Sequence, residues 1–320
     1  FGSSTFGPGT RCPMQGSHAF TPAMSRGASE SSAAWRWPSL LGSLSCRGCA
    51  VHCTDVPAKD MGDLAKLGKA QASRPPEFPD DGEGLAWQPQ TSVEGGKRYT
   101  GQWKAGVRHG DGVLEQPDGS RYGGQFRAGK AHGSGRFVAA SGSSYHGQWR
   151  EDCAHGEGTY VKVDRWTYTG QWANDKKNGV GSERLSNGSC YNGQYLNGKR
   201  HGQGVYWSPD GIQYEGEFRV DRMHGDGKYT FSDGRTYEGQ WREGYESGRG
   251  KMCWPSGASY DGQYREGVKS GEGTYTGADG SMYRGQWFGG KQHGRGRALD
   301  VQGRITKGFW AEGIQMQLTT

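Results

Sequence analysis

One cluster of side chains near the N-terminus could bind a metal ion. Cys46, Cys49, His52 and Cys53 stand close together, and thiolate and imidazole groups are the usual zinc ligands. A structural zinc site, however, joins two ligand pairs across an ordered loop, and no second pair follows. The sequence therefore favours a reduced, flexible cysteine cluster, with palmitoylation near Trp35, Trp37, Leu40 and Leu41 as an alternative. We predict neither a metal site nor a cofactor.

Histidine recurs before a glycine along the rest of the chain. The copies are His109, His132, His155, His201, His224 and His293. A catalytic histidine needs a nucleophile or a carboxylate held beside it at one unique place. Six copies, with Asn178, Ser247 and Ser270 at the corresponding points elsewhere, indicate a structural role in a turn. The chain also has no phosphate-binding G-x-x-x-x-G-K-[ST] motif, so we predict that it is not an enzyme.

These histidines belong to a repeat of 23 residues, the spacing between Tyr99 and Tyr122. Each repeat has a tyrosine, a glycine two residues later and an aromatic residue two further on, as in Tyr99, Gly101 and Trp103. Nine repeats are complete, and a partial tenth covers 306–313. The residues that define the pattern most clearly are Tyr99, Gly101, Trp103, Tyr145, Trp149, Tyr168, Trp172, Tyr237, Trp241, Tyr283 and Trp287.

The pattern within one repeat predicts a β-hairpin. In Tyr-x-Gly-Gln-Trp the alternation places the two rings and the glycine on one face of a strand, where a neighbouring ring can cover the glycine. We expect a turn over 105–110 and a second strand beginning near Gly112. The repeat closes on pairs such as Asp118-Gly119, which favour a tight hairpin because both residues can adopt positive φ.

Stacked hairpins of this kind predict an all-β fold. We expect an elongated, twisted, single-layer antiparallel sheet in which each repeat adds roughly 10 Å and buries its rings against its neighbours. Such a sheet has no central core, which is consistent with a chain that is only 32% hydrophobic yet contains 59 glycines and 12 tryptophans.

The composition divides the chain into four parts. Residues 1–80 are rich in Ser, Gly, Ala and Pro and are expected to form a disordered, low-complexity arm, with an organelle transit peptide as an alternative. Residues 81–98 are similar to the second half of a degenerate repeat and are expected to cap the first hairpin. The repeats cover 99–313, and 314–320 form a short tail.

The consensus Y-x-G-x-W-x-x-G-x-x-H-G-x-G-x-x-x-x-x-D-G closely resembles the MORN (membrane occupation and recognition nexus) repeat. Residues 99–119 and 191–211 match it almost throughout. One departure is systematic, because the residue before the ring is Gln in eight repeats and Glu only at Glu217, whereas the family more often has Glu. The resemblance implies a scaffold of the cilium, axoneme or cortical cytoskeleton, as in radial-spoke head proteins. It also implies two alternatives, a peripheral phospholipid-binding module and the regulatory repeats of a truncated phosphatidylinositol phosphate kinase.

Charge favours the scaffold over the membrane module. The net charge is only +6, and most repeats are near neutral, whereas binding to anionic lipid needs clustered Lys and Arg. The exception is repeat nine, a candidate lipid-binding or partner-binding patch formed by Arg284, Lys291, Arg295, Arg297 and Arg304.

The family resemblance and the charge pattern also predict the partners and the location of the protein. We expect cytoskeletal or ciliary proteins as partners, weak binding of anionic phospholipid as a lesser alternative, and no nucleic acid. A homodimer could form through exposed strand edges. No secretory signal is visible and the cysteines are odd in number, so the expected location is the cytoplasm, in the cytoskeleton or cilium or at the periphery of a membrane.

Overall fold

The computed structural model describes residues 84–316. The chain divides into two compact units. Among the described residues, the first compact unit holds 84–178 and 183–186, and the second holds 179–182 and 187–316. The predictions for the arm (1–80), for the cysteine cluster (46–53) and for residues 317–320 lie outside the described residues.

Both compact units consist of antiparallel β-strands. The first compact unit contains β1 (Ala86–Val93), the 3₁₀ turn η2 (Glu94–Gly96), β2 (Lys97–Lys104), β3 (Val107–Glu115), β4 (Arg121–Arg127), β5 (Lys130–Val138), β6 (Ser144–Arg150), β7 (Cys153–Lys162) and β8 (Trp166–Ala173). The second contains β10 (Cys190–Leu196), β11 (Lys199–Trp207), β12 (Gln213–Arg219), β13 (Arg222–Thr230), β14 (Thr236–Arg242), β15 (Tyr245–Cys253), β16 (Ser259–Arg265), β17 (Val268–Thr276), β18 (Met282–Phe288), β19 (Lys291–Leu299), β20 (Ile305–Ala311) and β21 (Ile314–Met316). The strand β9 (Lys176–Leu185) is divided between them.

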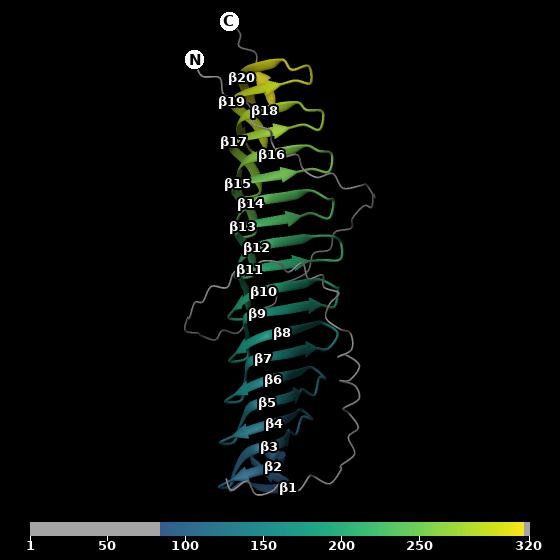
Figure 1. Ribbon diagram of the computed structural model, residues 1–320, viewed down its shortest axis with the longest axis vertical. Coiled ribbons are helices and arrows are strands. Elements are labelled where there is room, and N and C mark those ends of the chain that lie inside the picture. The colour runs from purple at the N-terminus through teal and green to yellow at the C-terminus, as the bar shows by residue number, and fades with distance from the viewer. Residues whose placement is uncertain (1–83, 317–320) are drawn as a thin grey trace. The chain divides into compact units, whose positions relative to one another are not determined.

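The predicted all-β fold of antiparallel hairpins is confirmed. Within each compact unit the strands pair with their neighbours in sequence, as Figure 1 shows for β2 to β8 and for β10 to β20. The part of the chain that the structure describes contains no α-helix, and therefore no helix able to cross a membrane. At residues 81–98, where we expected a capping half-repeat, β1 pairs with β2 in a register that sets Thr91 opposite Tyr99.

The first turn of each repeat is shorter than the sequence predicts. Strand β2 ends at Lys104 and β3 begins at Val107, so only Ala105 and Gly106 form the turn. Both have positive φ, 52° and 75°, which is the type I′ geometry that matches the twist of paired strands. His109 therefore lies in strand β3 and not in a turn, and the predicted position of the histidines is wrong.

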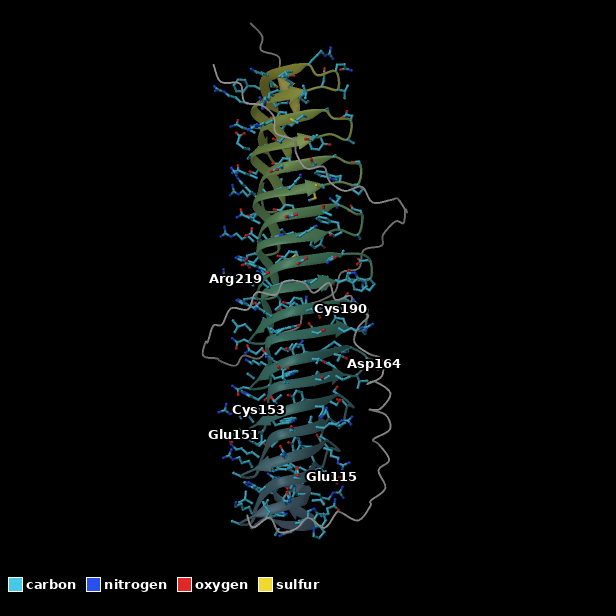
Figure 2. The ribbon with its side chains drawn as sticks, viewed as in Figure 1. Glu115, Glu151, Cys153, Asp164, Cys190 and Arg219 are labelled. Carbon is cyan, nitrogen blue, oxygen red and sulfur yellow. The ribbon has the colours of Figure 1, made fainter. Side chains whose placement is uncertain are left out.

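The Asp-Gly pairs also differ from the prediction. Gly119 has a φ of 88°, but Asp118 does not have positive φ. Instead the Asp118 carboxylate accepts a hydrogen bond from the Ser120 amide at 2.8 Å, while the Gly119 amide donates to the Gln116 carbonyl. The connection is thus a longer turn closed by the aspartate side chain. The two kinds of turn lie on opposite edges of the first compact unit, with Glu151 marking one edge and Asp164 the other (Figure 2).

Candidate binding faces

The strand register divides the side chains between two faces. In repeat five, Tyr191 lies opposite Tyr206, Gly193 opposite Gly204 and Tyr195 opposite Arg200, so these positions share one face. We call it the aromatic face, and it holds repeat positions 1, 3, 5, 10, 14 and 16. The alternate positions, such as Asn192 and Val205, form the opposite face, which we call the charged face.

The rings of the aromatic face form an edge-to-face series. Within each compact unit, a position-1 tyrosine packs against the ring of its own repeat and against the ring of the next, as Tyr99 does with Trp103 and Phe126. Ring centroids are 5.0 to 5.3 Å apart along this series in the first compact unit. They are 5.0 to 5.5 Å apart in the second. Edge-to-face packing matches the positive ring edge to the negative face, so each repeat stabilises the next.

Each position-1 tyrosine is also held by a hydrogen bond. The Tyr99 hydroxyl donates to the Gln102 carbonyl at 3.0 Å, and the same bond occurs in all nine repeats at 2.8 to 3.1 Å. Burial raises the pKa of Tyr99 from 10.0 to about 12, because the phenolate would lose its hydration. These tyrosines are therefore structural, and their ring faces are not available to a partner.

The glycines permit this packing. A Cβ atom at Gly112 would lie 2.2 Å from the Tyr99 hydroxyl oxygen, and one at Gly101 would lie 2.5 Å from the Gly112 Cα atom. Both glycines thus let a ring lie on bare backbone, which is the role that the sequence pattern predicts.

The position-5 tryptophans are anchored to the preceding repeat. The Trp149 indole N–H donates to the Gly135 carbonyl at 3.0 Å, and Trp172, Trp241 and Trp287 make the equivalent bond. The Trp103 indole nitrogen is buried without a hydrogen-bond partner. Its repeat is preceded by β1, which does not supply the equivalent carbonyl.

A second set of rings on the aromatic face remains partly exposed. These are the position-16 rings Phe137, Tyr160, Tyr206, Tyr229 and Tyr275, which we call the ring row. Tyr206 and Tyr229 both lie directly opposite Tyr214, one on each side of β12. Members from consecutive repeats are therefore two strands apart, roughly 10 Å.

Cations at position 10 of four repeats lie over rings of their own or a neighbouring repeat. The Lys269 Nζ atom lies 4.8 to 5.2 Å from the ring centroids of Trp254, Tyr260, Tyr275 and Trp287. Arg108, Lys177 and Arg200 occupy the same position in their repeats, and Lys177 also forms a salt bridge with Glu183. Burial lowers the pKa of Lys269 because its ammonium loses water, and attraction to the four ring faces offsets that cost. Sequence reasoning missed these cations, although their recurrence at position 10 was visible.

The glutamine before each ring has a structural function. The Gln102 side-chain oxygen accepts a hydrogen bond from the Asp111 amide at 2.7 Å, where the strand bulges between Gly101 and Trp103. Six further glutamines make this bond: Gln125, Gln148, Gln194, Gln240, Gln263 and Gln286. Glycine suits the residue before the bulge amide, because Gly110 has a φ of 62° and a Cβ atom there would displace the Gln102 side-chain oxygen. The Gln positions thus close the bulge.

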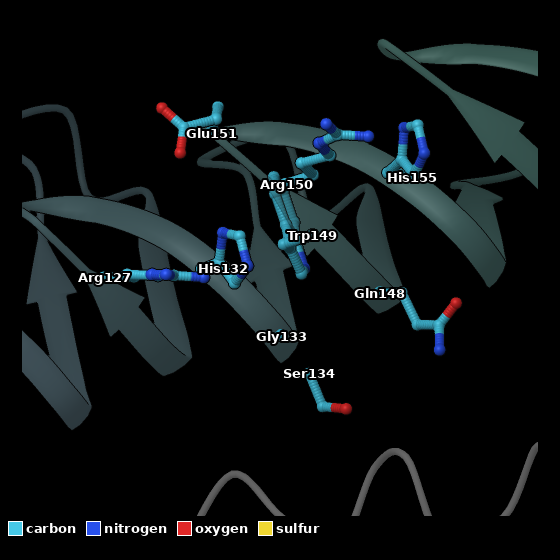
Figure 3. A pocket seen from close by; sticks show the side chains of 9 residues that line it. All are labelled: Arg127, His132, Gly133, Ser134, Gln148, Trp149, Arg150, Glu151 and His155. Atoms are coloured by element: carbon cyan, nitrogen blue, oxygen red, sulfur yellow. The ribbon is translucent and has the colours of Figure 1, made fainter.

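Two of the histidines, His132 and His155, lie beside an open pocket on the charged face. It is lined by His132, Ser134, Gln148, Glu151 and His155 among others, and Figure 3 shows the Ser134 and Glu151 side chains pointing in opposite directions. Glu151 pairs instead with Lys130 at 2.8 Å. Burial and the neighbouring Arg150 lower the pKa of His155, and its Nδ1 atom has no hydrogen-bond partner. The pocket does not bring a nucleophile, a base and a carboxylate together.

The predicted basic patch of repeat nine falls into two groups. Lys291 pairs with Glu312 and Arg304 with Asp300, so these two cations are neutralised locally. Arg284 and Arg297 lie directly opposite each other on β18 and β19, and Arg297 lies opposite Lys307 on β20. Arg295 lies 5.5 Å from the Phe309 ring. Lys307 was absent from the predicted patch because it stands in the partial tenth repeat.

The fold and the aromatic face together define a β-hairpin repeat protein. The MORN repeat family model matches residues 99–121, 122–144, 145–167, 168–190, 191–213, 214–234, 237–259, 260–282 and 283–303, more than half of the chain. The chain therefore belongs to the MORN repeat family.

Other comparisons add no functional argument. Comparison with curated proteins gives no match. Among solved structures, the chain is similar to the TCP10 domain of Danio rerio CPAP in complex with a STIL peptide, with 12% identity and a TM-score of 0.25, covering 69% of this chain and 98% of that one. The SAS-4 TCP domain of Drosophila melanogaster in complex with a proline-rich motif of Ana2 has 8% identity and a TM-score of 0.21, covering 75% and 97%. Both TM-scores are too low to support an inference about fold or function.

Proposed function

We propose that this chain is a non-catalytic scaffold that binds proteins of the cilium, the axoneme or the cortical cytoskeleton. The observation that carries the proposal is the ring row, in which partly exposed rings of consecutive repeats, such as Tyr206 and Tyr229, lie roughly 10 Å apart. Exposed tyrosine and phenylalanine side chains provide large contact areas at low entropic cost, which suits them to protein interfaces.

The rest of the described site supports binding over chemistry. The position-1 tyrosines are committed to packing and hydrogen bonds, and the position-10 cations lie over rings of their own sheet. The pocket on the charged face does not orient its histidines toward a nucleophile. The surface available to a partner is therefore the aromatic face, where partly exposed rings recur in five of the nine repeats.

The experiment is affinity capture from a lysate of ciliated cells, followed by cross-linking and mass spectrometry. The test variant is Y206S/Y229S, which removes two members of the ring row. The matched control is Y245S, because Tyr245 is also an exposed ring but lies at the turn edge of β15.

We expect the wild-type chain and Y245S to capture the same cytoskeletal proteins, and Y206S/Y229S to lose them while its thermal melt remains cooperative. The proposal is contradicted if the wild-type chain captures no cytoskeletal protein. It is also contradicted if all three chains capture cytoskeletal proteins in equal amounts. Sedimentation velocity on the same samples tests the expected homodimer.

A peripheral membrane function is the second candidate, because exposed apolar side chains accompany the cations of repeat nine. Phe288 and Ile305 are 66% and 60% exposed and lie on strands that also carry Arg284 and Lys307. Salt-sensitive pelleting with phosphatidylserine vesicles that is lost in R295E/R297E would favour this function over protein binding.

A further inference from the structure

The charged face of the second compact unit carries a row of charges in register across the strands. Position 2 of a repeat lies opposite position 15 on the following strand. That position 15 in turn lies opposite position 2 of the next repeat. The row runs Glu215, Lys228, Glu238, Lys251, Asp261, Thr274, Arg284, Arg297, Lys307. Opposite charges alternate over its first five members. The last three are all cations, so the alternation ends at Thr274.

Three adjacent cations are unfavourable in an isolated sheet. Residues directly opposite on antiparallel strands have Cβ atoms about 5 Å apart, and like charges at that distance repel. Arg284 and Lys307 are exposed, and neither forms a salt bridge with a described residue. An acidic ligand that reaches from β18 to β20 would supply counter-charges to Arg284 and Lys307.

A second row of side chains lies on the same face, two residues from the charged row along each strand. This second row becomes apolar over β18, β19 and β20. Two residues from each of the three cations, on the same face, lie Met282, Leu299 and Ile305. The corresponding row upstream consists mainly of the polar residues Gln213, Thr230, Thr236, Ser259 and Thr276, and it also includes Trp207 and Cys253. Three consecutive apolar residues therefore accompany the three cations where the alternation of charge has ended. We call these six residues the cationic–apolar surface.

We propose that the cationic–apolar surface binds an acidic amphipathic helix of a partner protein. Carboxylates three or four residues apart on a helix are about 5–6 Å apart, close to the roughly 4.8 Å between strands. Carboxylates on one side of an extended chain are further apart, roughly 6.7 Å. The apolar stripe beside the carboxylates would then cover Met282, Leu299 and Ile305.

The geometry favours a helix over a membrane. The cations span three strands, roughly 10 Å, which is about the diameter of one helix. On the same face, the upstream part of the row alternates between cations and carboxylates, so no continuous cationic stripe faces an extended anionic bilayer. This inference rests on the proposed scaffold function and names the chemistry of one partner.

The test uses the full chain and an 18-residue fluorescein-labelled peptide. The peptide carries Glu at positions i and i+4 along one stripe and Leu along the adjacent stripe. A scrambled peptide of the same composition is the ligand control. Two variants each neutralise two cations of the row: R284Q/K307Q within the surface, and K228Q/K251Q in the alternating part. Vesicles containing phosphatidylserine are tested in parallel.

We expect the helical peptide to bind the wild-type chain and K228Q/K251Q with affinities within about twofold, and to bind R284Q/K307Q about tenfold more weakly. The scrambled peptide should bind all three chains weakly. R284E/K307E, which restores alternation around Arg297, should lose binding while retaining the wild-type circular dichroism spectrum.

Three outcomes would overturn the inference: equal binding of both peptides, equal effects of the two Gln variants, or vesicle pelleting that depends on Arg284 and Lys307 without peptide binding. If the wild-type chain captures cytoskeletal proteins but does not bind the helical peptide, only the assignment of the cationic–apolar surface is wrong. If capture itself fails, the scaffold function is wrong.

Discussion

Tyr237 lies directly over Gly250, so that a Cβ atom at residue 250 would fall 2.3 Å from the Tyr237 hydroxyl oxygen. Tyr237 is fully buried, and its hydroxyl donates to the Gln240 carbonyl at 2.9 Å, so the ring cannot move aside. This contact joins the two strands of one repeat and recurs along the array.

The first prediction concerns this contact. G250A should lower the free energy of unfolding by about 1–3 kcal/mol, because the added methyl group overpacks a buried ring. Urea denaturation followed by tryptophan fluorescence measures it. G123A is the matched control, since a Cβ atom at Gly123 would meet only the Val113 side chain at 3.8 Å. An equal effect of the two substitutions would show that the ring–glycine contact is not what stabilises the repeat.

The second prediction concerns the glutamine that closes the bulge. The Gln194 side-chain oxygen accepts a hydrogen bond from the Gln203 amide at 2.9 Å. Q194A should cost about 1 kcal/mol of stability, because it leaves that amide without this partner. Q203A should be neutral within about 0.5 kcal/mol, because only the backbone of Gln203 takes part in the bond. Thermal melts of the two variants distinguish them, and equal melting temperatures would refute the assigned role.

The third prediction concerns stability at high pH. Burial raises the pKa of Tyr99 from 10.0 to about 12, and it also raises the pKa values of Tyr122, Tyr145, Tyr214, Tyr237, Tyr260 and Tyr264. The folded state therefore holds these protons more tightly than the unfolded state does. The resulting stability is complete below about pH 10 and is lost as the pH rises toward about 12.

Melting temperatures should therefore stay level from pH 7 to 9 and fall above pH 10. Tyrosinate absorbance near 295 nm should rise together with the loss of structure. If these tyrosines all ionised near pH 10 while the circular dichroism of the folded protein was unchanged, their assigned burial would be wrong.

The fourth prediction concerns the lysine enclosed by four rings. K269A should destabilise the protein by about 1–2 kcal/mol, because it removes the cation–π contacts and leaves a gap between the rings. K228A is the control, since Lys228 is an exposed cation on the opposite face. Urea denaturation measures both, and a neutral K269A would indicate that the desolvation of the ammonium cancels its attraction to the rings.

The fifth prediction separates stability from binding at the cationic row. R284E/K307E places opposite charges on both sides of Arg297 and should raise the free energy of unfolding by about 0.5–1 kcal/mol at low salt. Thermal melts at low and high ionic strength measure the gain, which should shrink as salt screens the charges. A loss of stability would mean that the three cations do not repel one another in the folded chain.

Much of the fold follows from the sequence because each repeat encodes its own hairpin. Along one strand, the side chains of one face belong to Tyr99, Gly101 and Trp103. This alternating pattern recurs every 23 residues in nine repeats. The face on which the rings lie, the glycines beneath them and the antiparallel pairing all follow from this alternation. The turns were less predictable. Ala105 adopts positive φ because the strand twist requires it, and nothing in its side chain indicates that conformation.

The sequence by itself determined the period, the all-β architecture and the membership of the aromatic face, because these depend on residues close together in the chain. Only the tertiary structure decided which residues lie opposite one another across strands. The bulge before Asp111, closed by Gln102, shifts the register, and a shift changes every cross-strand partner beyond it. That register brings Arg284, Arg297 and Lys307 into one row and encloses Lys269 within four rings.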